Sequence, residues 1–102
     1  MSVSCRIQDG VAVISVLGRF NFALHQPFRN ATVEALAASG IRSLEVNLYE
    51  TEYIDSSALG MLLVLREQAA GKGITSIKII GARGSVKQVL AIAKFEKFYT
   101  LD

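Results

Sequence analysis

The sequence is poor in the residues from which catalytic and metal sites are usually built. It has one histidine, His25, and one cysteine, Cys5. A metal site needs several Cys, His or carboxylate ligands, which these two residues do not supply. A Ser-His-acid arrangement would have to use His25, and no acidic residue stands at an obvious spacing from it. We therefore expect no enzyme, no metal and no cofactor, and we expect His25 to be a surface residue.

Other absences bear on the compartment. A lone cysteine cannot form an internal disulfide, and the sequence opens without the positively charged and apolar leader of an exported protein. The apolar run from Met61 to Leu65 is far shorter than the roughly 18 residues that cross a membrane. We therefore expect a protein of the cytoplasm that does not insert into membranes.

Length and charge narrow the class further. The chain of 102 residues has no low-complexity tract, which predicts a single domain over 1–102. Residues 1–65 carry four basic and six acidic side chains, and residues 66–102 carry seven basic and three acidic ones. The basic residues of the second part are spread singly rather than clustered with aromatic residues, so we expect no nucleic-acid binding. They are Arg66, Lys72, Lys78, Arg83, Lys87, Lys94 and Lys97.

The first half of the chain predicts a hairpin followed by a helix. Residues 3–8 and 11–17 alternate between polar and apolar, and Asp9-Gly10 between them is a strong hairpin turn signal. Gly18 is expected to end the second strand, with residues 19–21 as an exit loop. Apolar residues then recur at helical spacing from Phe28 to Leu36, with Pro27 in the first turn and Gly40 after the end.

The second half alternates strands and helices. We expect a strand over 43–48, a loop over 49–54, a helix over 57–72, a strand over 75–80 and a helix from about Ser85. Residues 95–101 can pack against the core or add a short fifth strand. The expected fold is α/β, with a mixed sheet of four to five strands and about three to four helices mainly on one face.

The change from strand to helix near residue 55 is the most informative stretch. Asp55 and Ser56 are both types that cap a helix by accepting a hydrogen bond from its first-turn amides. The free amides and the helix dipole favour an anion there, including a phosphate. Ser56, and secondarily Ser57, are therefore candidate phosphate acceptors. Glu50, Glu52 and Asp55 could loosely hold a divalent cation, but an acidic loop beside a helix is more often solvated.

The helix after Asp55 carries apolar residues on more than one side. We expect one apolar face formed by Leu59, Leu62, Leu63, Ala69 and Ala70, with Met61, Val64, Leu65 and Gln68 largely on the other side. A helix needs one face to cover a sheet, so the second set is either buried by another element or exposed to a partner. Exposure of Met61, Val64 or Leu65 would create a docking surface beside Ser56.

The run Asp55-Ser56-Ser57-Ala58-Leu59-Gly60, after a strand and before an aliphatic helix, resembles the signature of the STAS domain of bacterial anti-sigma factor antagonists. The resemblance covers essentially the whole chain and implies the same α/β architecture. It implies that Ser56 is the serine a kinase phosphorylates and that Asp55 supports it. The chain departs from the pattern in two places: Ala58 stands where the family usually has glycine, and Asn21 stands where an acidic residue is usual.

The resemblance also implies partners: an anti-sigma factor or serine kinase of the histidine-kinase-like ATPase class, and a PP2C-type phosphatase. The expected function is that of a module that binds its regulator when Ser56 is unphosphorylated and so controls transcription. We expect the partner surface to comprise Asn21, Phe22, Ser57, Ala58, Leu59, Met61 and Leu65.

Two other interpretations remain open from the sequence. The chain could be a STAS-type structural subunit that docks on a transporter ATPase or regulatory complex without phosphorylation. It could also be an enzyme or ligand-binding module that uses the acidic loop. The sequence alone does not identify the partner, the pathway or the oligomeric state.

Overall fold

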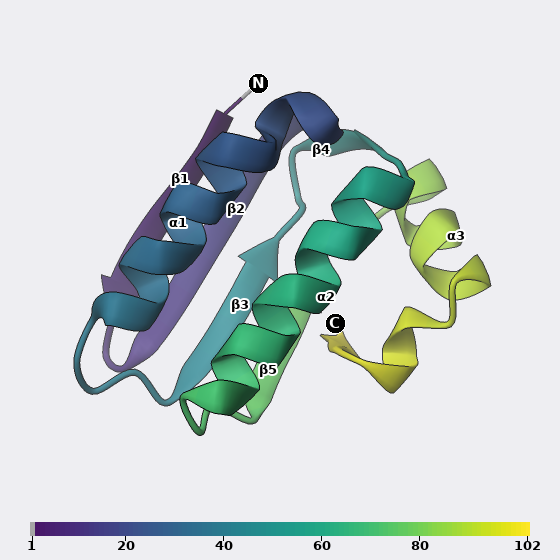
Figure 1. Cartoon of the computed structure of the whole chain (residues 1–102). Coiled ribbons are helices and arrows are strands. Elements are labelled where there is room, and N and C mark those ends of the chain that lie inside the picture. The colour runs from purple at the N-terminus through teal and green to yellow at the C-terminus, as the bar shows by residue number, and fades with distance from the viewer. Residues whose placement is uncertain (1) are drawn as a thin grey trace.

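Two helices lie side by side over one face of a six-stranded sheet in the computed structural model, which describes residues 2–102 (Figure 1). In chain order the main elements are β1 (Ser2–Gln8), β2 (Val11–Phe20), α1 (His25–Ala37), β3 (Ser43–Asn47), β4 (Thr51–Ile54), α2 (Ser56–Gly71), β5 (Ser76–Ile80), α3 (Gly84–Ile92) and β6 (Thr100–Leu101). Two 3-10 turns, η1 (Phe22–Leu24) and η2 (Phe95–Lys97), precede α1 and β6. The expected α/β class and the N-terminal hairpin are confirmed.

The sheet is mixed. Its order is β1-β2-β3-β5-β6, with β1 antiparallel to β2 and the other pairs parallel. β4 lies off this path: residues 11–15 of β2 pair with β3, whereas residues 18–20 pair with β4. A single long strand thus holds two successive parallel partners on the same side.

The core lies between the sheet and the two helices. Alternate residues of β2 face the helices, and their partners in register on β3 and β5 do the same, as the two-residue period of strands requires. From the sheet, the buried residues include Ala12, Ile14, Val16, Phe20, Leu44, Val46, Ile54, Ile77 and Ile79. From the two helices they include Phe28, Ala31, Thr32 and Ala35 of α1 and Ala58, Leu62, Leu65 and Ala69 of α2. No helix in residues 2–102 has the length and apolar character needed to span a membrane.

The hairpin turn shows why its residues are needed. Asp9 and Gly10 have φ of 54° and 80°, as a tight hairpin turn demands. The Arg42 guanidinium donates a hydrogen bond to the Asp9 carbonyl at 2.7 Å. A Cβ on Gly10 would lie 3.0 Å from Arg42 Nε, so glycine also makes room for this contact. The turn is thereby tied to the chain entering β3.

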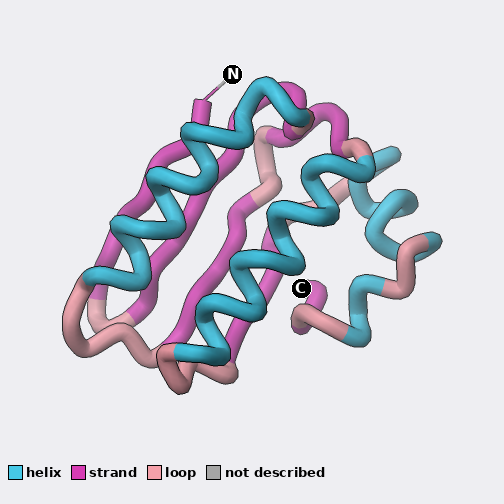
Figure 2. Tube along the Cα trace, viewed as in Figure 1, coloured by secondary structure: helices cyan, strands magenta, loops and turns pink. Residues whose placement is uncertain are grey.

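Two expected loops are partly strands. Residues 19–21 do not all form an exit loop, because β2 shifts its register after Gly18, at φ 88°, and continues to Phe20. Residues 49–54 are not all loop either, because residues 51–54 form β4 beside that end of β2. The two-residue β6 is the short fifth strand allowed for in residues 95–101, and β4, which was expected as loop, brings the sheet to six strands instead of four to five. The tube in Figure 2 shows β2, η1 and α1 following one another with almost no intervening loop.

The C-terminal aromatic residues anchor the chain end to α2. Phe95 and Tyr99 are buried, with their rings stacked at 5.9 Å between centroids. The Tyr99 hydroxyl donates a hydrogen bond to the Leu62 carbonyl at 2.5 Å. Burial raises the pKa of this hydroxyl well above its ordinary value of 10.0, and the nearby charge of Arg66 only partly opposes the rise. The folded state therefore holds Tyr99 neutral.

This hydrogen bond leads to a pH-dependent prediction. Near pH 8, Tyr99→Phe should lower the free energy of unfolding by about 0.5–1.5 kcal/mol, the usual net value of one hydrogen bond. Above about pH 10 the tyrosine ionises in the unfolded chain but not in the folded one, so wild-type stability should fall with rising pH. The difference between wild type and Tyr99→Phe should therefore shrink. Urea unfolding of both proteins at about pH 8 and about pH 11 measures this, and a constant difference would contradict it.

Candidate functional site

The α2 helix begins with an exposed serine that directly follows an aspartate N-cap in the chain. Asp55 has extended backbone angles, and its Oδ1 accepts a hydrogen bond from the Ala58 amide at 3.1 Å. Ser56 is the first residue of the helix and is exposed, whereas Ser57 is half-buried. The cap predicted from the sequence is thus provided by Asp55. This leaves the Ser56 hydroxyl on the surface at the positive end of the helix dipole.

The β4 strand sets the position of this helix start. The buried Thr51 hydroxyl donates a hydrogen bond to the Val16 carbonyl of β2 at 2.7 Å, and the Thr51 amide bonds the Leu48 carbonyl at 3.0 Å. Pairing with β2 then carries the chain to Ile54, one residue before Asp55. Arg19 of β2 lies over the Tyr53 ring at 4.2 Å from its centroid, adding a cation–π contact across the same pair.

The loop after β2 is brought to the same place. The Asn21 side chain accepts a hydrogen bond from the Ala23 amide at 3.0 Å and so caps η1. An amide oxygen performs this role as a carboxylate does, so Asn21 keeps the local structure that an acidic residue would give, without the charge. Phe22 follows, 67 % exposed, and its ring stacks on His25 at 5.2 Å. His25 is exposed, as expected, but it has an aromatic partner that sequence analysis missed.

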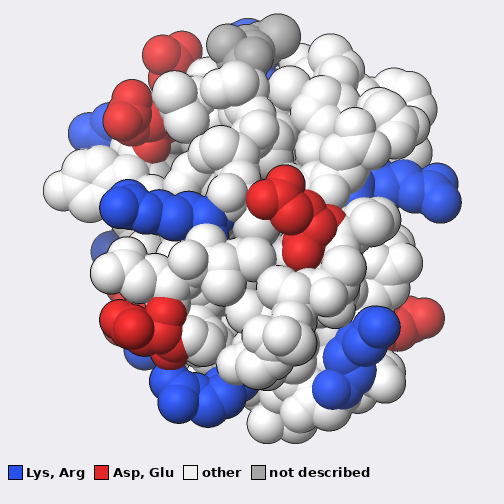
Figure 3. Space-filling model, turned by 90° about the vertical axis from the view of Figure 1, so that its left-hand side faces the viewer, with Lys and Arg blue, Asp and Glu red and all other residues white. Residues whose placement is uncertain are grey.

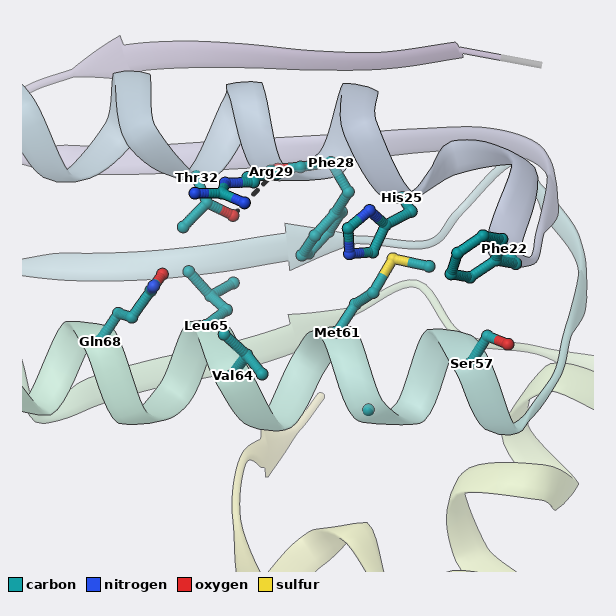
Figure 4. Close-up of a pocket in the computed structure, with 11 residues that line it drawn as sticks. Phe22, His25, Phe28, Arg29, Thr32, Ser57, Met61, Val64, Leu65 and Gln68 are labelled. Carbon is teal, nitrogen blue, oxygen red and sulfur yellow. Dashed lines mark hydrogen bonds between the residues drawn. The ribbon is translucent and has the colours of Figure 1, made fainter.

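A groove between α1 and α2 joins these residues (Figure 4). Its volume is about 560 Å³, and its walls include Phe22, His25 and Arg29 from the α1 side and Ser57, Met61 and Val64 from the α2 side. Phe28 and Leu65 also line it, although both side chains are buried. The start of α1 and the start of α2 therefore face each other across this groove. The groove itself was not predicted, because it depends on the spacing of two helices far apart in the sequence.

The structure corrects the expected contact set at two positions. Ala58 is fully buried and Leu65 is 1 % exposed, so neither presents a side chain to a partner. The reason is the phase of α2: the buried stripe runs through residues 58, 62, 65 and 69, at helical spacing. The methyl group at Ala58, where the STAS signature usually has glycine, therefore lies in the core. Leu63 and Ala70, expected in the buried face, are exposed.

The remaining residues of that set have some exposure. Phe22 is exposed, whereas Asn21, Ser57, Leu59 and Met61 are half-buried. Val64 is 54 % exposed, which meets the condition stated for a docking surface beside Ser56. An apolar surface therefore extends along α2 from the serine pair.

The charged groups near the site form no metal cluster. The Asp55 carboxylate is engaged by the Ala58 amide, and within residues 2–102 no group of three His, Cys, Asp or Glu side chains could hold a metal ion. Cys5 lies on β1, and its thiol pKa is raised by burial and, to a smaller extent, by Glu34. Basic and acidic side chains are interspersed on the face shown in Figure 3, which carries no broad patch of one sign. The site therefore offers a hydroxyl, a helix terminus and an apolar groove, an arrangement suited to binding.

Comparison with known proteins finds STAS domains that match most of the chain. A family model described as "Mlab, STAS domain" matches residues 3–101. A STAS-domain containing protein of Pseudomonas aeruginosa, PA14_20770, is 41% identical over 89 residues, which cover 87% of this chain and 85% of that protein.

Solved structures share the fold at low identity. An anti-sigma factor antagonist from Mycobacterium paratuberculosis has a TM-score of 0.81 at 21% identity, over 98% of this chain and 83% of that one. The phosphorylated form of the Bacillus cell fate determinant SpoIIAA has a TM-score of 0.73 at 12% identity, over 99% and 91%. A sulfate transporter family protein from Wolinella succinogenes has a TM-score of 0.74 at 15% identity, over 90% and 73%. From the match over 3–101 and the six-stranded fold, we conclude that the chain belongs to the STAS-domain family.

Proposed function

We propose that this protein is an anti-sigma factor antagonist, a protein-binding module that is switched by phosphorylation of Ser56. The observation that carries the proposal is the position of Ser56: exposed, first in α2, and next in the chain to Ser57, which lines the groove with Phe22, Met61 and Val64. A kinase can reach such a hydroxyl, and a partner that covers the apolar surface must also pass close to it. The module binds rather than catalyses, and the lone Cys5 is in keeping with a cytoplasmic protein.

The switch works through charge. A phosphate would add about −1.5 to −2 charges at the N-terminus of α2. The helix dipole and the first-turn amides favour that charge within the domain by about 0.3–1 kcal/mol, although the Asp55 carboxylate at the N-cap opposes it. A partner that covers the site would have to desolvate the phosphate or pair it. Phosphorylation should therefore leave the fold intact and weaken the complex.

The proposed partners follow from the family resemblance. They are an anti-sigma factor or serine kinase of the histidine-kinase-like ATPase class, and a PP2C-type phosphatase that removes the phosphate. Support comes from the shared fold of a known anti-sigma factor antagonist and of SpoIIAA, a protein of this fold that exists in a phosphorylated form. In the unphosphorylated state, this protein would bind the anti-sigma factor and release its sigma factor.

A second candidate keeps the surface but removes the switch. The chain would be a STAS-type structural subunit docking on a transporter ATPase, with Ser56 as an ordinary contact residue. Two observations favour it: a sulfate transporter family protein shares the fold, and the groove between α1 and α2 needs no phosphate to form. The two candidates differ in whether Ser56 is modified in the cell.

The first prediction is therefore a modification. The protein isolated from its own cells should carry one phosphate, located on Ser56 by peptide mass analysis. The phosphate should be absent from Ser56→Ala and removed by phosphatase treatment. Growth, stress and starvation should change its level. Absence of phosphate under all three conditions would reject the switch and favour the constitutive subunit.

The second prediction separates binding from folding. Ser56→Asp should keep a cooperative melt, because a carboxylate is favourable in the first turn of a helix. The partner is first recovered by cross-linking from the same cells. The affinity of Ser56→Asp for this partner should be more than tenfold lower than that of the wild type, which corresponds to about 1.4 kcal/mol. Melting curves and biolayer interferometry measure the two effects.

Ser85→Asp is the matched control for this variant. Ser85 is also an exposed serine in the first turn of a helix, but it lies in α3, which does not line the groove. It should bind the partner as the wild type does. Unfolding of Ser56→Asp, or equal binding loss in both variants, would contradict the assignment of Ser56 as the switch.

A further inference from the structure

The groove beside Ser57 continues along the whole of α2. A second hollow of about 460 Å³ lies between the C-terminal halves of α1 and α2 and includes Val33, Leu36, Gly71 and Lys72 in its walls. The two hollows share Thr32 and Gln68. Together they form one channel, the α1–α2 groove, that follows α2 from Ser57 to Lys72. At 1.5 Å per residue this is about 22 Å, the length of four helical turns.

The edges of the α1–α2 groove are apolar and open. Phe22 is 67 % exposed, Val33 60 % and Val64 54 %, and the three lie at intervals along the groove. A pocket for a small molecule encloses most of its ligand, whereas this groove leaves its largest apolar edges in water. Such a surface is typical of a protein interface.

Two glycines leave the backbone of α2 bare along this groove. Gly60 lines the first hollow and Gly71 the second. A Cβ on either would meet no atom within 4 Å. Packing within the domain therefore gives no reason for glycine at position 60, where it weakens the helix relative to alanine. Bare backbone does allow another helix to approach closely.

The charges of the groove have one sign. Arg29 and Lys72 line it, and no aspartate or glutamate does. Among residues 2–102, the salt bridge that forms joins Lys78 to Asp102. Arg29 and Lys72 therefore have no carboxylate partner within those residues. An occupant with acidic residues would supply the missing partners.

We propose that the α1–α2 groove binds an amphipathic helix of a partner protein, with the apolar face of that helix in the groove and acidic residues directed at Arg29 and Lys72. Helices of this kind place anchors at i, i+3 or i+4 and i+7 in apolar grooves. The inference deepens the proposed function and rests on it for the role of this surface in partner binding. It also explains the switch: a phosphate on Ser56, next to Ser57 at the end of the groove, would repel an acidic helix.

The test needs no knowledge of the partner. The full unphosphorylated chain is used to select binders from a displayed library of random 16-residue peptides. Enriched sequences should share apolar residues at helical spacing and carry aspartate or glutamate beside them. A synthetic peptide of the leading sequence should then shift the amide resonances of Gly60 and Gly71. No enrichment, basic or proline-rich winners, or shifts confined to another surface would overturn the proposal.

The first pair of variants tests whether the peptide binds in the groove. Gly60→Leu should lower the affinity for that peptide at least tenfold, while its melting temperature stays equal or rises, because the side chain enters open space and favours the helix. Ala70→Leu places the same side chain at an exposed position of α2 that does not line the groove, and it should bind normally. Equal binding by Gly60→Leu and wild type would overturn the proposal.

The second pair of variants tests the charge. Selection on Arg29→Glu should no longer enrich acidic peptides, whereas selection on Lys87→Glu, an exposed position of α3, should give the wild-type result. A concentration-dependent dimer that Gly60→Leu disrupts would assign the groove to a second copy and overturn the proposal. Peptide binding without any phosphate on Ser56 in cells would reject the switch and keep the groove. Phosphate on Ser56 without peptide binding would keep the switch and reject the groove as a binding site for a helix.

Discussion

The position of the whole site depends on one short parallel pairing, that of β4 with the end of β2. Only residues 18–20 of β2 take part, and the pairing is reinforced by the bond from the Thr51 hydroxyl to the Val16 carbonyl. This contact fixes where the chain leaves the sheet and therefore where Asp55 can cap α2. Because β2 also leads into η1, the same strand end places Phe22 and His25 opposite Ser57. The serine and the apolar groove are thus held together by the C-terminal end of β2 and its pairing with β4.

Most of the fold could be predicted from local patterns. The hairpin followed from Asp9-Gly10 and alternation, and the helices followed from apolar spacing, with Gly40 after the end of the first. The strand that was missed is β4, because its four residues carry too little periodicity to be distinguished from loop. β4 also depends on a register shift after Gly18 and on a buried threonine hydroxyl, neither of which leaves a local signature.

The candidate site was only partly predictable, for a related reason. The cap at Asp55 and the exposure of Ser56 follow from the strand-to-helix change, which is local. The buried face of α2 does not, because apolar residues surround the helix and its phase is decided by the sheet beneath it. Leu65 was therefore assigned to the surface and Leu63 to the core, the reverse of what packing selects. The α1–α2 groove lies between two helices separated by β3 and β4, so no single segment reveals it.

On α2, the residues that form the core are largely different from the residues that line the groove. Residues 58, 62, 65 and 69 of this helix are buried in the core, whereas residues 57, 60, 61, 64, 65 and 68 line the hollow beside the helix start, so the two sets share only Leu65. Substitutions in the second set can change what is recognised without altering what folds. After gene duplication, two copies of this domain could therefore acquire separate partners through a few changes on one helix. Whether such copies share or separate their partners would then be governed by about five residues of one helix.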